Sequence, residues 1–302
     1  MRIRIDLAYD GTNFHGWAKQ PTLRTVQGEL QHALEKLLRI QSGDQFLQIV
    51  VAGRTDTGVH ANHQVCHVDV DEVSLQRCVG YMQTDAIHAL EYRLRRVLPS
   101  DIAVHSVSEA PEGFDARFSA LDRTYVYRIC DDERSYDPRL RNCILRIRQK
   151  LDIKLMNEAA GLIIGLHDFG SFAIPNPNGT TIREVKTAYW ERIDNRTLLS
   201  ETAKKTQIAY NPDTVESGLL CFTIVADAFA HNMVRSLVNA CVQIGMHKKT
   251  LDWFEEKMQH PLREGSTGPI DACGLTLEHV EYPQDDLLAS RADLVRAKRS
   301  LD

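Results

Sequence analysis

The chain has 302 residues, of which 43% are hydrophobic and 25% are charged, a composition typical of a globular protein with a real core. Its sequence contains no run of about 18 apolar residues, so we expect no membrane-spanning segment. The formal net charge of -5 argues against attraction of the whole molecule to nucleic acid, although residues 123–150 contain eight Lys/Arg against four Asp/Glu and could form a local basic groove.

The N-terminal sequence and the cysteines indicate the compartment. "MRIRIDLAYD" lacks the uninterrupted apolar run of a signal peptide. The seven cysteines are scattered and never spaced C-x-x-C, so disulfides and zinc clusters are not expected. We therefore expect a soluble, cytoplasmic protein with buried free thiols.

The first part of the chain alternates predicted strands and helices. Period-two alternation predicts strands, whereas an apolar stripe at helical spacing, preceded by Thr25 as N-cap, predicts the first helix. Pro99 is expected to end the second helix. The predicted strands are 2–10, 48–53, 63–71 and 102–110, and the predicted helices are 25–40 and about 75–98.

The second part repeats this pattern. Its polar stretch 196–217 predicts a loop, and the charged tail after Pro283 is expected to be loose. The predicted strands are 123–130, 185–194, 218–229 and 274–282, and the predicted helices are 154–167, 232–246 and 251–259.

Each part thus resembles a β-α-β-β-α-β unit. We expect an α+β fold with two ferredoxin-like (RRM-like) halves, whose sheets face a central cleft and whose helices pack behind. The expected divisions are residues 1–108, residues 109–284 and a charged tail at 285–302, with "SEAPEG" at the first boundary.

The stretch "VVAGRTDTGVHANHQV" places Asp56 on a Gly-rich turn at the end of a strand. Loops at strand ends are where a rigid scaffold presents reactive groups. Arg54 could keep the carboxylate ionised through a charge-assisted pair, and an ionised carboxylate suits a nucleophile or a general base. The alternative is an aspartate that only caps its own turn.

Histidines follow this loop, but their spacing does not favour a metal site. Cys66 and His67 point to opposite faces of the predicted strand, and His63 and His67 lie about 13 Å apart along it. We expect His60 and these two histidines to have structural or surface roles, and we expect no metal.

Two further stretches carry candidate binding residues. In "ARFSALDRTYVYRI", Tyr125 and Tyr127 share a strand face among arginines, which suits stacking on bases and contact with phosphate, or else two core tyrosines. In "AFAHNMVRSLV", Arg235 lies at the edge of an apolar helical stripe, where it needs an anionic partner such as Asp56 or reaches solvent by snorkelling. Motifs for phosphate-binding loops, dinucleotide binding and serine hydrolysis do not occur.

Taken together, these motifs resemble the TruA family of tRNA pseudouridine synthases. The resemblance spans most of the chain, and the "GRTD-x-GVHA" core is its most specific signal. The motifs occur in the family's order: "YDGTNFHGW", "TVQGELQHAL", "VAGRTDTGVHA", "FDARFSALDRTYVYRI", "GLHDFGSF" and "AFAHNMVRSLV".

The resemblance implies a cofactor-free isomerase that cleaves the N1–C1′ bond of uridine and rejoins the base through C5. It implies uridines on the 3′ side of the tRNA anticodon loop and stem as substrates, and a homodimer in which one tRNA contacts both subunits. It assigns Asp56 as the nucleophile, Tyr125 to the target base, Arg54 to the same loop, Arg235 to the catalytic carboxylate and Leu275 to the pocket. Attack at C1′ and attack at C6 both remain open.

Two hypotheses of other classes compete with this one. A non-catalytic RNA-binding protein with tandem RRM-like sheets would have no need of Asp56 beside Arg54, and the N-terminal strand lacks the aromatic pattern of such modules. A metal-dependent nuclease would lose its activity in EDTA.

Overall fold

The computed structural model describes residues 1–40, 47–176, 179–194 and 214–295. The strands are β1 (Arg2–Tyr9), β2 (Val50–Val51), β3 (His60–Asp69), β4 (Ile102–Glu109), β5 (Asp122–Cys130), β6 (Leu145–Arg146), β7 (Gly165–Asp168), β8 (Ile182–Arg192), β9 (Leu220–Ala226) and β10 (Leu275–Glu281). The helices are α1 (Val26–Leu38), α2 (Glu72–Arg77), α3 (Ala86–Val97), α4 (Ile153–Gly161), α6 (Met233–Gly245), α7 (Leu251–Gln259) and α8 (Leu288–Val295).

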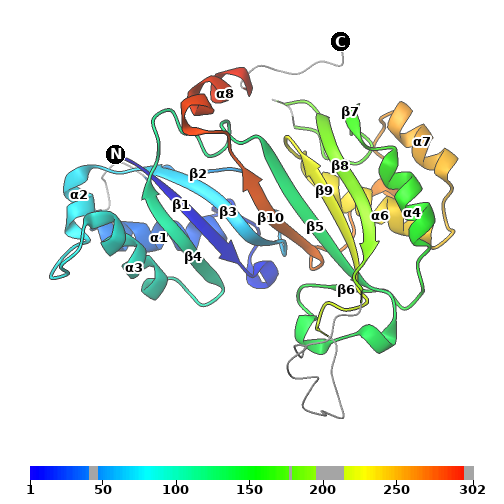
Figure 1. The fold of residues 1–302 in the computed structure, drawn as a ribbon, viewed down its shortest axis with the longest axis horizontal. Coiled ribbons are helices and arrows are strands. Elements are labelled where there is room, and N and C mark those ends of the chain that lie inside the picture. The colour runs from blue at the N-terminus through cyan, green and yellow to red at the C-terminus, as the bar shows by residue number, and fades with distance from the viewer. Residues whose placement is uncertain (41–46, 177–178, 195–213, 296–302) are drawn as a thin grey trace, which may run out of the picture.

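The strands of the described residues form one sheet in the order β4-β1-β3-β10-β5-β9-β8-β7, with β2 paired to β3 and β6 paired to β5 (Figure 1). The α+β class is therefore confirmed. The expected pair of facing sheets is wrong, because the strands of both halves join edge to edge. In both halves the last strand lies next to the first, and the first lies next to the strand that precedes the last. This pattern gives the orders β4-β1-β3 and β10-β5-β9.

We call the strands β1–β4 with their helices the first half and the strands β5–β10 with theirs the second half. The two halves join between β3 and β10. β2 has two residues and pairs with only the end of β3, at His67 and Cys66. The start of β3 would otherwise expose an unpaired edge. β10 pairs with it in parallel at Thr276–His60 and Leu277–Ala61, and β10 pairs along its length with β5. The shortness of β2 thus explains why one sheet forms.

The helices lie in two groups, α1–α3 beside the first half of the sheet and α4, α6 and α7 beside the second (Figure 1). The helix predicted after Thr25 is confirmed, and the Thr25 side chain accepts a hydrogen bond from the Gly28 N–H as an N-cap does. The face of β1 with Ile3, Ile5 and Leu7 is fully buried and belongs to the core.

Three predicted elements differ from the structure. The helix expected at 154–167 ends at Gly161, and the strand β7 starts at Gly165, whose φ is +114°. The single helix expected at 75–98 is two helices, α2 and α3, because Gly80 adopts a left-handed conformation (φ 57°) and Asp85 starts α3 as an N-cap. The tail expected to be loose forms α8. Its Leu288 is buried, and the Leu288 carbonyl oxygen accepts a hydrogen bond from the Ser119 hydroxyl. Residues 296–302 and most of the predicted loop at 196–217 lie outside the described residues.

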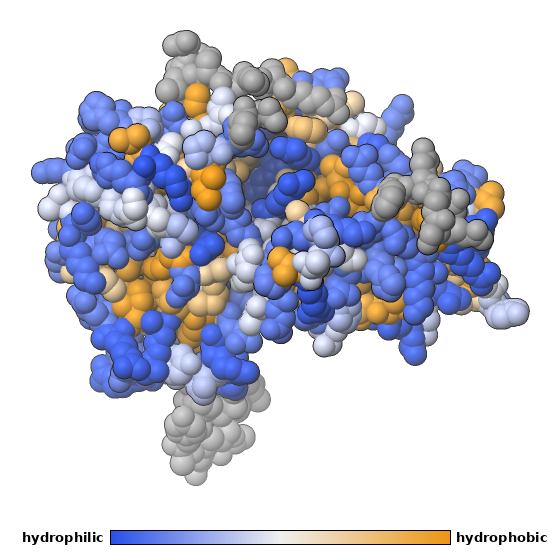
Figure 2. Space-filling model, turned by 180° about the vertical axis from the view of Figure 1, so that it is seen from behind, coloured by the Kyte–Doolittle hydropathy of each residue, from blue (hydrophilic) through white to orange (hydrophobic). Residues whose placement is uncertain are grey.

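Figure 2 shows the molecule from behind, with a hollow near the middle of the surface surrounded mainly by hydrophilic residues. In the part of the chain that the structure describes, no helix combines the length and the apolar composition needed to cross a bilayer.

Candidate active site

Asp56 lies in the loop between β2 and β3, and neighbouring backbone holds this loop in place. The Gly58 N–H donates to the Phe14 carbonyl oxygen at 3.2 Å, and the Trp17 N–H donates to the Thr55 carbonyl oxygen at 3.1 Å. Phe14 and Trp17 are themselves buried in the core. Backbone hydrogen bonds to a buried segment therefore fix the position of the main chain around Asp56.

Gly16 allows this close approach. Its φ of +84° lies in the left-handed region, and a Cβ at this position would lie 2.8 Å from the Thr55 carbonyl oxygen and 3.3 Å from the Asp56 carbonyl carbon. A side chain on residue 16 would therefore push the Asp56 loop away, in addition to straining its own backbone.

A buried polar network fixes the other side of the loop. The Tyr9 hydroxyl contacts the Thr55 hydroxyl at 2.7 Å, and the Gln64 amide donates to the Tyr9 hydroxyl at 3.2 Å and to the Gly53 carbonyl oxygen at 2.8 Å. Burial raises the pKa of Tyr9 to about 12. The hydroxyl therefore stays protonated, as a member of this network, at any physiological pH.

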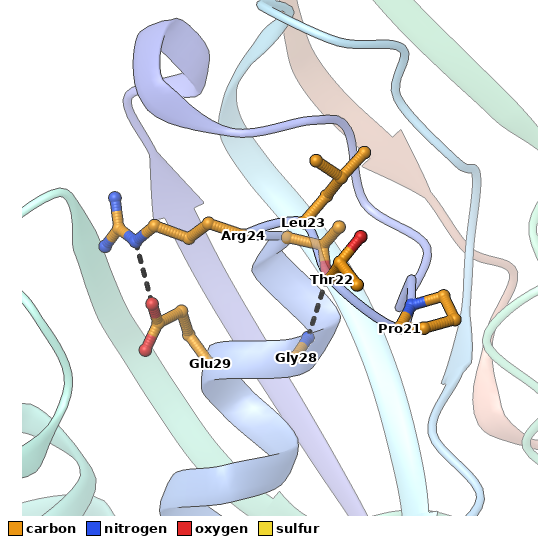
Figure 3. A pocket seen from close by; sticks show the side chains of 7 residues that line it. Pro21, Thr22, Leu23, Arg24, Gly28 and Glu29 are labelled. Carbon is orange, nitrogen blue, oxygen red and sulfur yellow. Dashed lines mark hydrogen bonds and ion pairs between the residues drawn. The ribbon is translucent and has the colours of Figure 1, made fainter.

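Arg24 anchors the supporting segment from outside. It pairs with both oxygens of Asp101, at 2.7 and 3.0 Å, and with Glu29 at 2.7 Å, while its guanidinium lies 4.2 Å from the centre of the Phe14 ring. Figure 3 shows the recess beside it, lined by residues 21–25 and the first turn of α1. The recess belongs to this support and not to the surroundings of Asp56.

The Asp56 carboxylate contacts charged side chains of the second half. Its Oδ1 lies 3.4 Å from His231 Nε2, and its Oδ2 lies 3.9 Å from Arg235 Nη1. The aspartate side chain is 26% exposed. Burial raises the pKa of Asp56, and the nearby His231 and Arg235 side chains oppose that rise.

The expected pair between Arg54 and Asp56 is not formed among the described residues. Arg54 is exposed, and the carboxylate contacts His231 and Arg235 instead. The expected contact between Arg235 and Asp56 is present. Sequence spacing within a turn does not define which side of the chain each side chain takes, and this explains the difference.

Arg235 is held in place by the backbone that precedes β10. Its Nε donates to the Ile270 carbonyl oxygen at 2.7 Å, and its side chain is 16% exposed. Arg235 lies in the first turn of α6, which starts after Asn232 in a left-handed conformation (φ 64°). The guanidinium is therefore a fixed positive charge beside Asp56.

The sequence analysis missed His231. It stands in the same "AFAHNMVRSLV" stretch as Arg235, which was the available signal. However, its direction depends on the left-handed turn at Asn232, which residue spacing does not reveal.

The two tyrosines of β5 have different environments. Tyr125 is 7% exposed, its ring packs edge-on against Phe229 with centroids 5.1 Å apart, and burial, together with the nearby Asp56 carboxylate, raises its pKa. Tyr127 is fully buried, and its hydroxyl donates to the Asp271 carbonyl oxygen at 2.7 Å. Tyr125 therefore belongs to the site, whereas Tyr127 belongs to the core and supports the turn before β10.

Leu275 lies at the start of β10, next to this turn. It is buried and pairs across the sheet with Tyr127, and its N–H donates to the Ala272 carbonyl oxygen at 2.9 Å. A Cβ on Gly58 would lie 3.1 Å from the Ala272 Cβ, so the same turn borders the Asp56 loop. Leu275 is thus close to the loop in the fold, with its side chain in the core cluster.

The histidines near β3 have partners within the fold. His60 accepts a hydrogen bond from the Gly11 N–H, His67 accepts one from the Ala116 N–H, and His63 contacts His279 at 3.0 Å. Across the described ranges, no group of three or more His, Cys, Asp or Glu side chains is arranged to hold a metal ion.

Comparison with known proteins identifies relatives over the whole chain. A family model described as tRNA pseudouridine synthase matches residues 7–119 and 159–283. The protein named tRNA pseudouridine synthase A of Bifidobacterium longum is 59% identical over 302 residues, 99% of each chain, and that of Bifidobacterium animalis subsp. lactis is 61% identical over 300 residues, again 99% of each. The protein of that name from Streptomyces avermitilis is 40% identical over 302 residues, which cover 100% of this chain and 95% of the relative. The Asp56 site, held by the backbone of one half and surrounded by side chains of the other, thus belongs to a member of the tRNA pseudouridine synthase family.

Proposed function

We propose that this chain, an enzyme that isomerises uridine to pseudouridine in tRNA, uses Asp56 as its nucleophile. The observation that carries the proposal is the setting of this one carboxylate. It is partly buried, it lies between His231 and Arg235, and the buried ring of Tyr125 adds to the site. A carboxylate held by charges at 3.4 and 3.9 Å, and not by short hydrogen bonds, keeps its lone pairs available for attack.

The chemistry needs no net transfer of electrons or groups, since uridine and pseudouridine are isomers. If Asp56 attacks C1′, the N1–C1′ bond breaks as the ester forms, the base turns, and C5 then bonds to C1′ and displaces the carboxylate. If Asp56 instead adds to C6, the N1–C1′ bond breaks, the base turns and rejoins C1′ through C5, and the carboxylate leaves C6 as the C5 proton is removed. In either case the C5 proton is lost, and N1 gains a proton, so the atoms balance without a cofactor. The base must leave its stack to meet Asp56, which costs a few kcal/mol that contacts in the site must offset.

The remaining site residues receive binding roles in this proposal. Tyr125 packs against the extruded base, and Leu275 forms part of the pocket wall. Arg54 is exposed on the same loop as Asp56 and is available to contact the RNA. Arg235 balances the charge of Asp56 from its fixed position.

We further propose uridines of the anticodon arm, on its 3′ side, as the substrates, and a cytoplasmic homodimer as the working form. The net charge of -5 supports the dimer. One copy carries basic stretches such as residues 123–150 singly, whereas a groove shared by two copies would bring such stretches together against the RNA. The working units of each copy are residues 1–108 and 109–284, with residues 285–302 as a charged tail.

The decisive experiment uses tRNA labelled with tritium at C5 of uridine, because tritium is released only when C5 is bonded to C1′. The Asp56→Asn variant should fold and bind tRNA but release tritium at least about 10³-fold more slowly than the unchanged protein. Normal release by this variant would show that Asp56 is not the nucleophile. Binding of tRNA by the unchanged protein without any release would instead support the RNA-binding alternative.

A further inference from the structure

The two oxygens of the Asp56 carboxylate have different neighbours. Oδ2 faces Arg235, which is 16% exposed and anchored through its Nε to the Ile270 carbonyl oxygen. Oδ1 faces His231, whose side chain is 57% exposed. One oxygen therefore meets a fixed cation, and the other meets a side chain that is open to solvent and to an incoming ligand.

His231 is placed by a backbone turn in which the next residue, Asn232, has an unfavourable left-handed conformation. The His231 carbonyl oxygen accepts a hydrogen bond from the Ile174 N–H at 2.9 Å, and the next residue, Asn232, has a φ of +64°. Asn232 makes no side-chain cap to the first turn of α6. A non-glycine residue in the left-handed region costs free energy, and such conformations concentrate at functional sites. The turn aims His231 at Asp56 without adding a cap to the helix.

The charges around Asp56 make the contribution of His231 distinct. Three elements face the carboxylate: α6 with Arg235, the segment before α6 with His231, and β5 with Tyr125, whose hydroxyl stays neutral because burial raises its pKa. Burial also raises the pKa of Asp56, and of the two side chains that oppose this rise His231 has the larger effect. Removing the histidine therefore leaves the burial of Asp56 opposed by Arg235 alone.

We propose that His231 is a positioning residue for the isomerisation, which holds the Oδ1 atom of Asp56 from the open side of the site before the uridine enters. The proposal rests on the proposed role of Asp56 as the nucleophile. It assigns His231 no contact with the uridine.

The test compares His231→Ala and His231→Gln in the full chain, with tritium release measured against tRNA concentration and pH. In His231→Ala, kcat should fall about tenfold at pH 7.5, because Oδ1 of Asp56 loses the side chain that holds it from the open side, with KM for tRNA little changed. The acid limb of kcat/KM should move up by about one pH unit, because Asp56 has lost an opposite charge. His231→Gln retains a donor near the position of Nε2 but carries no charge, so it should recover most of kcat while the acid limb stays shifted.

His88 supplies a matched control. It is an exposed histidine that contacts an aspartate, Asp85, at 2.6 Å, but it lies at the start of α3 in the other half. His88→Gln should leave kcat, KM and the acid limb unchanged.

Two outcomes would overturn the inference. A rise in KM with unchanged kcat and an unshifted acid limb would show that His231 only contacts RNA, and wild-type behaviour of both variants would show that it has no role. Asp56→Asn, measured in parallel, separates the two proposals. If that variant is inactive while the His231 variants behave like the unchanged protein, only the role of His231 is lost. If Asp56→Asn is active, the nucleophile assignment itself has failed.

Discussion

The two halves of the molecule contribute to the Asp56 site in different ways. The first half holds the loop through main-chain hydrogen bonds, with Trp17 and Phe14 as partners, and through the buried hydroxyl of Tyr9. The second half contributes side chains at 3.4 and 3.9 Å from the carboxylate, namely His231 and Arg235. The position of Asp56, the proposed nucleophile, is thus fixed by one half, and the side chains that act on its charge come from the other.

This difference implies that substitutions in the two halves should produce different defects. Changes in the second half should alter rate and pH dependence while the protein remains stable. Changes in the first half should lower the free energy of unfolding and reduce activity as a consequence.

The largest effect is expected for Arg235→Leu. Loss of the fixed cation leaves the Asp56 carboxylate partly buried with His231 as its remaining charged partner, so the pKa of Asp56 rises further. We expect kcat/KM to fall by about 10²- to 10³-fold, with the acid limb displaced to higher pH. The measurement is tritium release from pH 5 to 9.

Arg54→Gln is the matched control for this prediction, because Arg54 precedes Asp56 by two residues yet does not pair with it. Its effect should appear in KM for tRNA, with the acid limb unchanged. A displaced acid limb in Arg54→Gln would contradict the division of roles between the two arginines.

Gly16→Ala should give the next largest effect, in the first half. The added Cβ would lie 2.8 Å from the Thr55 carbonyl oxygen, at a φ of +84°. We expect the free energy of unfolding to fall by about 2 kcal/mol, as measured by urea denaturation, and kcat to fall because the Asp56 loop is displaced.

Gly53→Ala tests whether this effect is specific. Gly53 lies in the same loop, but a Cβ there meets no atom within 4 Å and its φ is not positive. The variant should unfold within about 0.5 kcal/mol of the unchanged protein. Equal destabilisation by both alanines would argue against close approach as the cause.

A smaller loss is expected for Tyr9→Phe. The substitution removes the hydroxyl that the Thr55 hydroxyl and the Gln64 amide contact, and it leaves the aromatic packing intact. Unsatisfied buried groups of this kind cost about 1–2 kcal/mol in unfolding free energy. Tyr92→Phe, at an exposed position on α3, should change this free energy very little, and the acid limb of activity should be unchanged in both variants.

The smallest effect is expected for Arg24→Lys. Lysine keeps the charge but loses the bidentate contact with Asp101 and the stacking over Phe14. Because the Arg24 side chain is 35% exposed, the loss should be about 1 kcal/mol or less, and smaller still in high salt. A loss that does not depend on salt would show that packing on Phe14, and not charge, is the main contribution.

Much of the fold followed from local patterns in the sequence. Alternation predicted the longer strands but not β6 and β7, and Thr25 with its apolar stripe predicted α1. The single sheet could not be predicted in this way, because it depends on pairing between His60 and Thr276, which lie far apart in the chain, and on the shortness of β2. The break between α2 and α3 required knowledge of the conformation of Gly80.

The site was predicted to a similar extent. Asp56 as the nucleophile stays a prediction, whereas the expected contact between Arg235 and Asp56 is present. Burial reversed the expected effect on the carboxylate, since desolvation raises the pKa of Asp56 where a nearby guanidinium alone would lower it. The exposed position of Arg54 and the approach of His231 depend on turns whose side-chain directions sequence spacing does not specify.

The position of β10 also has a consequence for biosynthesis. This strand, at residues 275–281, lies between β3 and β5 and is the element through which the two halves pair. During translation, Asp56, His231 and Arg235 are all synthesised before β10, the strand through which the two halves pair. A chain that terminates before residue 275 should therefore be inactive and not merely slow. It would contain all three of these residues but lack the strand through which the two halves pair.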